Sequence, residues 1–225
     1  MTLYLHVTGF GPFCGVETNP TTHLMERLSN AAPSSSPATS SLSDRLFACG
    51  CVLLSTSVLV VSGKAVDADL KSLTEAEDAR QKHYPLAPND FLLRIHFGVH
   101  GSATKVHVES TAWNEANFRC PDEAGWQPIK EPIDATAADS LQSGLPLQAL
   151  IDEAALTCST PALLSTDPGR FVCNYTYFRS LQRTAVCPRS DAVFVHVPPT
   201  QVLSLEKVEE FLIHFCQAAR KQLCQ

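Results

Sequence analysis

Strand-like and helix-like segments alternate along most of the chain, and this alternation constrains the fold more than any other sequence feature. Short apolar segments, expected as strands, lie at residues 3–7, 46–61 (one or two strands), 91–97, 105–110, 161–165 and 191–197. Segments with helical periodicity lie at residues 20–28, 67–83, 147–156, 173–182 and 204–223. Such alternation is typical of a mostly parallel, twisted sheet covered by helices. We therefore expect an α/β fold, a single-domain α/β/α sandwich.

The remaining segments predict loops within one domain. A chain of 225 residues can bury one sizeable core, so we expect a single domain over residues 1–225. Residues 30–44 are rich in Ser, Ala, Thr and Pro and are interpreted as a surface loop. Residues 114–145 carry several Pro and Gly residues. We interpret them as an irregular segment and advance the hypothesis that it forms a flap over the functional site.

Composition and charge exclude several classes of partner. Apolar residues make up 44% and charged residues 18% of the chain, as in ordinary globular proteins. The formal net charge is −6 and the basic residues are scattered, which argues against a nucleic-acid partner. The most apolar stretch, residues 51–61, contains Ser and Thr and is too short to span a bilayer, so we expect no membrane partner. No signal-peptide pattern is visible at residues 1–10.

The chain has nine cysteines, an odd number with irregular spacing and no C-x-x-C pair. This pattern does not predict a disulfide framework, and it favours reduced thiols in a cytoplasmic protein. Most of these thiols are expected to be small buried hydrophobic groups. Cys173 is different because the predicted strand–turn–helix pattern places it at the start of a helix.

Three chemically distinctive segments follow or end predicted strands. Phe10 and Phe13 follow the first strand, Cys173 begins the helix after residues 161–165, and His196 lies near the end of the last strand. In open α/β sheets, ligands bind outside the carboxyl ends of the strands. We therefore expect these residues to meet at one edge of the sheet.

The residue types in this constellation suit nucleophilic catalysis. The free N–H groups and dipole of a helix N-terminus favour a thiolate and can hold an oxyanion, which suits Cys173. His196 can accept the thiol proton and pass it to a leaving amine. Glu109, on a predicted strand, can orient the imidazole. Each of the three also fits a simpler role, as a core cysteine, a core histidine and a solvent-facing carboxylate.

In its motifs the chain resembles the pyroglutamyl peptidase I family of cysteine peptidases. The matching motifs occur in family order at residues 7–13 with Asn19 and Pro20, then at residues 98–101, 109–114, 119–128, 169–174 and 194–198. The resemblance implies an α/β/α sandwich, no metal and no cofactor. It also implies hydrolysis after an N-terminal pyroglutamyl residue of peptides, through a thioester acyl-enzyme. The implied triad is Glu109, Cys173 and His196.

The same resemblance assigns residues to the substrate pocket. It implies that aromatic and apolar side chains line a slot for the neutral lactam, with an arginine near the oxyanion and an asparagine that supports the pocket. Many bacterial members have glutamine at the position of Val99, so backbone groups are expected to recognise the lactam there. The residues so assigned are Phe10, Phe13, Asn19, Val99, Arg119, Phe171 and Val172.

Other functions are less well supported by the sequence. The Gly9-x-Gly11 pair lacks the third glycine of a dinucleotide site, and Pro12 removes a backbone N–H. Histidines at positions 96, 100 and 107, with the carboxylate at 109, match no strong metal-ligand spacing. A nucleoside phosphorylase and a catalytically silent binding protein remain alternatives on the same architecture. The sequence does not distinguish a monomer from a dimer.

Overall fold

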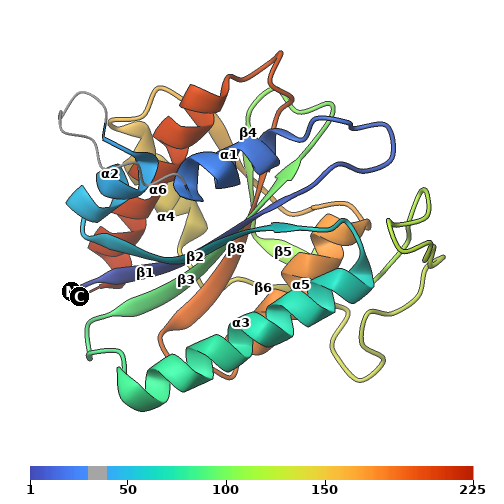
Figure 1. The fold of residues 1–225 in the computed structure, drawn as a ribbon, viewed down its shortest axis with the longest axis horizontal. Helices are drawn as coiled ribbons and strands as arrows, with labels where there is room; N and C mark the ends of the chain where they lie inside the picture. Colours follow the sequence, from blue (N-terminus) through green and yellow to red (C-terminus); the bar gives the residue numbers. More distant parts are fainter. Residues whose placement is uncertain (30–39, 225) are drawn as a thin grey trace.

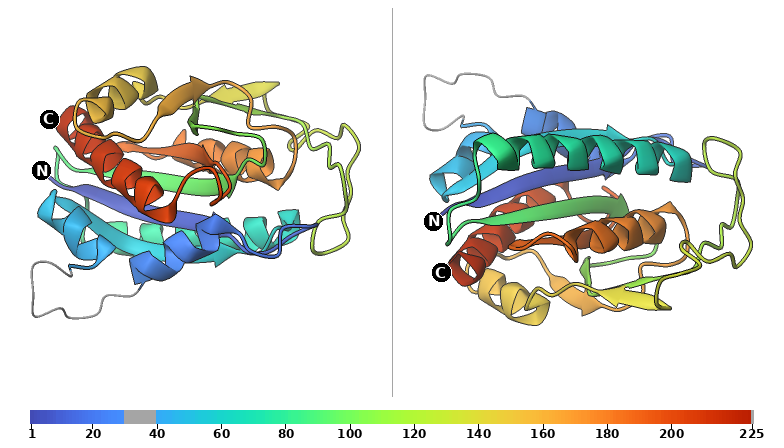
Figure 2. Two further views of the ribbon diagram at one scale, coloured as in Figure 1. Left: turned by 90° about the horizontal axis from the view of Figure 1, so that it is seen from above. Right: turned by 90° about the horizontal axis from the view of Figure 1, so that it is seen from below.

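The computed structural model describes residues 1–29 and 40–224, and a six-stranded sheet lies between two helical layers (Figure 1, Figure 2). The strand order is β2-β1-β3-β8-β4-β7. In the described sheet β4 and β7 are parallel to each other and run antiparallel to the other four strands, so that β4–β8 is the antiparallel pair. The predicted α/β fold with a mostly parallel sheet is confirmed. Its strands are β1 (Leu3–Phe10), β2 (Cys51–Leu59), β3 (Phe91–Val99), β4 (Val106–Glu109), β7 (Ala162–Ser165) and β8 (Ser190–Val197).

Helices cover both faces of this sheet. On one face lie α1 (Pro20–Ser29), α2 (Leu42–Ala48), α4 (Leu147–Ala155) and α6 (Leu205–Leu223), whose apolar side chains share the larger hydrophobic core. On the other face lie α3 (Gly63–His83) and α5 (Val172–Thr184), which share a smaller core (Figure 1). A separate antiparallel pair, β5 (Thr111–Trp113) and β6 (Ser140–Gln142), packs against α5.

The pleat of the strands separates apolar from polar side chains. Along β8, Val193, Val195 and Val197 enter the larger core, whereas the alternate residue Phe194 enters the smaller one. Successive strand residues point to opposite faces, so His196 shares the α5 face with Phe194. The same alternation along β4 places Glu109 on the α5 face, because Val106 and Val108 belong to the larger core. Local periodicity thus fixes which face carries the polar groups.

Two expectations about secondary structure were wrong in part. Residues 42–48 form helix α2 where a loop and the start of a strand were expected, because Ser41 and Asp44 form a reciprocal capping box. Within the segment expected to be irregular, Ser140–Gln142 form strand β6. Residues 30–39 of the predicted Ser-rich loop lie outside the described residues.

The two ends of the sheet differ in what surrounds them. The chain termini lie at one end, and residues 114–139 extend from the opposite end (Figure 1, Figure 2). Asp122 anchors this segment, since its carboxylate accepts a hydrogen bond from the N–H of Gly63 at the start of α3, over 2.9 Å. Within the described part of the chain, none of the helices is long and apolar enough to cross a membrane.

Candidate active site

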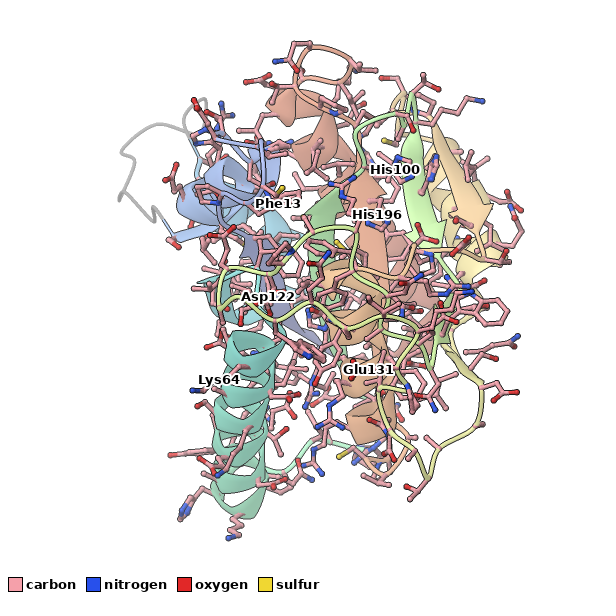
Figure 3. The ribbon with its side chains drawn as sticks, turned by 90° about the vertical axis from the view of Figure 1, so that its right-hand side faces the viewer. Phe13, Lys64, His100, Asp122, Glu131 and His196 are labelled. Carbon is pink, nitrogen blue, oxygen red and sulfur yellow. The ribbon has the colours of Figure 1, made fainter. Side chains whose placement is uncertain are left out.

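A cavity of about 970 Å³ opens at the carboxyl ends of β3 and β8. Figure 3 views this end of the molecule and shows His100 and His196 close together, with Phe13 at the same end. Six of the ten predicted site residues line the cavity. They are Phe13, Val99, Arg119, Phe171, Cys173 and His196. The topology therefore brings together residues that are far apart in the sequence. The strand-edge argument is confirmed for the residues at the carboxyl ends of β1, β3 and β8. It is wrong for Cys173, because the preceding strand β7 runs antiparallel to β8 and residues 166–171 connect it to the helix start.

His196 is held by a buried carboxylate. Its Nδ1 lies 2.8 Å from Oε1 of Glu109, and the Glu109 side chain is fully buried. Burial alone would lower the pKa of His196. Hydrogen bonds to Cys173 and Glu109, together with their negative charges, outweigh this effect and raise the pKa to about 9. The imidazole is therefore protonated at neutral pH, and Nε2 is the nitrogen left for the thiol.

Cys173 is the second residue of α5 and is only partly buried. The helix begins after Phe171, whose side chain accepts no hydrogen bond from the start of the helix. The first N–H groups of α5 therefore have no capping side chain as acceptor. A Cβ atom added at Gly98 would lie 3.0 Å from Sγ of Cys173 and 2.9 Å from the Phe194 ring. Gly98 is therefore the residue that leaves room for the thiol beside His196, its partner in the β3–β8 register.

Aromatic rings form one side of the cavity. Phe171 is the centre of this group, with its ring centroid 6.1 Å from that of Phe13 and 4.8 Å from that of Phe118. The guanidinium carbon of Arg119 lies 5.8 Å from the Phe171 centroid. The cavity thus combines flat apolar surfaces with the guanidinium groups of Arg119 and Arg170, near the helix start that carries Cys173.

Three residues assigned to the pocket lie instead in the core and do not line the cavity. Phe10 and Val172 belong to the smaller hydrophobic core, against which Phe13, Phe171 and Cys173 pack. Asn19 is buried and donates from Nδ2 to the carbonyl of Gly11, over 3.0 Å. The side chains of Phe10 and Val172 thus support the cavity from behind, and Asn19 shapes the loop that carries Phe13.

Several residues at the site escaped the sequence reasoning. His100 lines the cavity, and its ring lies edge-on to that of His196 at a centroid distance of 5.6 Å. Burial and the nearby charge of His196 lower the pKa of His100. Asn174 donates to the carbonyl groups of Trp113 and Glu115 and so ties the start of α5 to the neighbouring segment. The signal for Asn174 was its position beside the predicted nucleophile.

The histidines at positions 96, 100 and 107 do not form one group in the structure, because His96 has other partners. His96 lies on β3, where its two ring nitrogens contact the hydroxyl groups of Thr8 and Ser180 at 2.8 and 2.9 Å. Histidines 100 and 107 do approach each other, with centroids 5.4 Å apart. Across residues 1–29 and 40–224, no group of three or more His, Cys, Asp or Glu side chains is arranged to hold a metal ion.

Comparisons with known proteins identify relatives of this chain. The sequence model of the pyroglutamyl peptidase family matches residues 61–211, a range that contains Glu109, Cys173 and His196. A pyrrolidone-carboxylate peptidase of Streptococcus pyogenes serotype M5 (strain Manfredo) is 31% identical over 193 residues, covering 85% of this chain and 76% of the relative.

Solved structures show the same architecture. The crystal structure of pyroglutamyl peptidase I from Bacillus amyloliquefaciens is similar with a TM-score of 0.74 and 25% identity, over 98% of this chain and 96% of that one. Pyrrolidone carboxyl peptidase from Thermococcus litoralis gives a TM-score of 0.76 with 25% identity, over 99% of this chain and 95% of that one.

Proposed function

Because the family model matches more than half of its length, this chain belongs to the pyroglutamyl peptidase family, and we propose that it cleaves N-terminal pyroglutamyl residues from peptides through Cys173, His196 and Glu109. The enzyme is a hydrolase of the pyroglutamyl peptidase I type. One observation carries the proposed triad: His196 is buried between a carboxylate and a thiol, and together they raise its pKa to about 9.

In the proposed reaction, the Cys173 thiolate is the nucleophile and His196 supplies the proton for the leaving group. The thiolate attacks the carbonyl carbon that joins the pyroglutamyl ring to the rest of the peptide. The first N–H groups of α5 and the Arg119 guanidinium stabilise the oxyanion that forms. His196 then gives its proton to the leaving amine, and the C–N bond breaks to leave a thioester on Cys173.

Water completes the cycle. Neutral His196 takes a proton from a water molecule, which attacks the thioester carbonyl and releases pyroglutamate and the Cys173 thiolate. Glu109 keeps the Nδ1–H of the imidazole fixed through both steps, so that Nε2 faces the reacting atoms. The two half-reactions need no group beyond the three side chains, the oxyanion donors and water.

The substrate pocket is proposed to recognise a flat, neutral ring. Phe13 and Phe171 offer apolar faces for the lactam, and Val99 at the end of β3 adds an apolar contact. We propose that backbone groups, rather than a side chain at position 99, bind the polar edge of the lactam. Phe10, Val172 and Asn19 would act by holding these lining residues in place. We expect the enzyme to act on peptides in the cytoplasm.

Hydrolysis of fluorogenic amides tests the proposal. The wild-type protein should cleave the pyroglutamyl amide and spare the prolyl amide, which has a similar ring but carries an ammonium group and lacks the ring carbonyl. Cys173→Ser should lower kcat/KM by roughly 10⁴- to 10⁶-fold, because the nucleophile and its base act as a unit. Cys187→Ser, a change at another partly buried cysteine, is the matched control and should be active. Equal turnover of both amides, or an active Cys173→Ser variant, contradicts the proposal.

A further inference from the structure

Two cysteines outside the proposed triad are next in sequence to residues that line the cavity. Cys14 is exposed, and Cys120 is partly buried. Cys14 lies close enough to Cys120 to raise its pKa, although 105 residues separate the two in the sequence. Each is next to a residue that lines the cavity, Phe13 in one case and Arg119 in the other.

Backbone geometry presents the first thiol. Phe13 and Val16 exchange two backbone hydrogen bonds, at 3.1 and 2.6 Å, so that Cys14 and Gly15 form the tip of a tight turn. Gly15 has a φ of 76°, a left-handed conformation that favours glycine at this position. Asn19 holds the base of the same loop through the carbonyl of Gly11. Cys14 is thus an exposed thiol on a well-defined turn.

The second thiol lies on the segment that crosses this end of the molecule (Figure 3). Phe118, two residues before Cys120, donates its N–H to the carbonyl of Pro128 over 2.9 Å, and Asp122, two residues after it, donates to Trp126 over 2.8 Å. The flanking backbone is therefore anchored on both sides.

The Phe171 ring contacts both of the segments that carry these cysteines. Phe13 and Phe118 both contact Phe171, with centroid distances of 6.1 and 4.8 Å. Residues close in sequence to both cysteines thus pack on the same partly buried ring, which brings the two segments together. From this arrangement we propose that Cys14 and Cys120 are a redox-modification site, which forms a reversible disulfide with a low-molecular-weight disulfide as oxidant.

The exchange balances in two steps. The Cys14 thiolate attacks a sulfur of the small disulfide, forming a mixed disulfide and releasing one small thiol. The Cys120 thiolate then attacks Sγ of Cys14, forms the protein disulfide and expels the second small thiol. The protein pair loses two electrons, the small disulfide gains them, and the two protons end on the two released thiols.

Exposure favours this order, because Cys14 is exposed and Cys120 is partly buried. Burial, and then the interactions with Cys14, raise the pKa of Cys120, while the Arg119 guanidinium acts in the opposite direction. The exposed thiol therefore meets the small disulfide first, and Cys120 resolves the mixed disulfide.

The disulfide would tie the Phe13 turn to the segment that carries Arg119. Both contribute residues that line the cavity, so the bond restricts how far they can separate when a peptide binds or leaves. We expect oxidation to lower turnover and a thiol reductant to restore it. Such a transient disulfide is compatible with a reducing compartment. The effect on turnover depends on the proposed peptidase activity, whereas the bond itself does not.

Incubation of the full chain with oxidised glutathione, followed by peptide mapping without reduction, tests the proposal. The expected product is a peptide pair joined through Cys14 and Cys120 and lighter by two hydrogen atoms. Loss of pyroglutamyl amidase activity should accompany its formation and should reverse with dithiothreitol. Absence of this linked pair, or glutathione adducts without the protein disulfide, would overturn the proposal whether or not the protein is a peptidase.

Single variants separate this site from oxidation of the nucleophile. Cys14→Ser and Cys120→Ser should both be active when reduced and should lose activity more slowly than wild type under oxidised glutathione. Cys187→Ser should behave like wild type. Modification of Cys173 is measured by mass in the same samples. If wild type and the two variants lose activity at the same rate, the loss comes from Cys173 and the proposed regulation is wrong.

Discussion

Two buried histidines on the α5 face of the sheet, His96 on β3 and His196 on β8, have opposite electrostatic surroundings. His96 contacts only hydroxyl groups among its hydrogen-bond partners, and burial, with the charges of Arg94 and His6, lowers its pKa to about 3. The pKa of His196 rises to about 9, although burial acts on it in the same direction as on His96. The partner groups, not the depth of burial, decide which histidine is charged.

The two histidines also differ in whether they reach the cavity. His96 is 0% and His196 3% exposed, so both belong to the interior, but only His196 lines the cavity. Near His96, Arg94 pairs with the buried carboxylate of Glu77, and the His96 imidazole takes no part in this ion pair. His96 is therefore a neutral link between β1, β3 and α5, and His196 is the group prepared for proton transfer.

Replacing the carboxylate should remove part of the difference. Glu109→Gln gives His196 a neutral partner like those of His96, so the pKa of His196 should fall from about 9, while the contribution of Cys173 is kept. Loss of the corresponding carboxylate in a serine-protease triad lowers kcat by about 10⁴-fold, and we expect a decrease of roughly 10³- to 10⁴-fold here.

The pH profile of the remaining activity checks the cause of this loss. In the wild type, kcat/KM should decrease above about pH 9, where His196 loses the proton that the leaving amine needs. In Glu109→Gln this alkaline limb should move to lower pH. Glu115→Gln, which alters a more exposed carboxylate, is the matched control. An unchanged alkaline limb in Glu109→Gln would show that Glu109 does not set the charge of His196.

A smaller loss of activity is expected from substitution of Gly98, which leaves room for the Cys173 thiol. Gly98→Ala places a methyl group 3.0 Å from Sγ of Cys173, which must move by a few tenths of an ångström or more. Displacements of this kind cost up to about 10²-fold in rate, and the loss should fall mainly on kcat. Gly101→Ala is the control, since its Cβ meets no atom within 4 Å. Equal kinetics for the two variants would contradict the role of Gly98.

Changes at His96 should affect stability and spare catalysis. His96→Leu removes both hydroxyl contacts and should lower the free energy of unfolding at pH 7 by about 1–3 kcal/mol. Denaturant unfolding measures this loss, and the pyroglutamyl amidase activity of the folded variant should match wild type. A loss of kcat comparable with that of Glu109→Gln would instead assign His96 to the catalytic machinery.

The two histidines should also give opposite pH dependences of stability. The pKa of His96 is lowered from 6.5 in the unfolded chain to about 3 in the folded protein. Between these two pH values the unfolded chain binds the proton more readily, so His96 lowers the free energy of unfolding as pH falls through this window. The folded pKa of His196 is raised from 6.5 to about 9, so its contribution is complete below pH 6.5 and is lost as pH rises through 9. Denaturant unfolding of wild type, His96→Leu and His196→Gln between pH 5 and pH 10 should resolve these two trends.

Much of the fold could be predicted from the sequence because the periodic patterns of its helices and strands are local. The period of two along β8 and the helical period of α6 are properties of neighbouring residues, and both elements were predicted within one residue of their observed bounds. Helix α2 was missed because its seven residues are too few to show a clear period, even though Ser41 and Asp44 carried a capping signal.

The sequence by itself predicted that Cys173 begins a helix and that His196 lies near the end of a strand. Those predictions rest on local periodicity. It also predicted Phe13 and Arg119 at the site, through the resemblance of their motifs to those of a peptidase family.

Only the tertiary structure decided which predicted residues line the cavity and which support it from the core. It placed Phe10 and Val172 behind the lining, set Gly98 beneath the thiol and brought Cys14 close to Cys120. It also distinguished His196 from His96, two histidines that each follow an apolar residue in a buried strand. Packing between distant segments and the charge of partners across the sheet produce these differences, and neither is encoded in the spacing of residues along the chain.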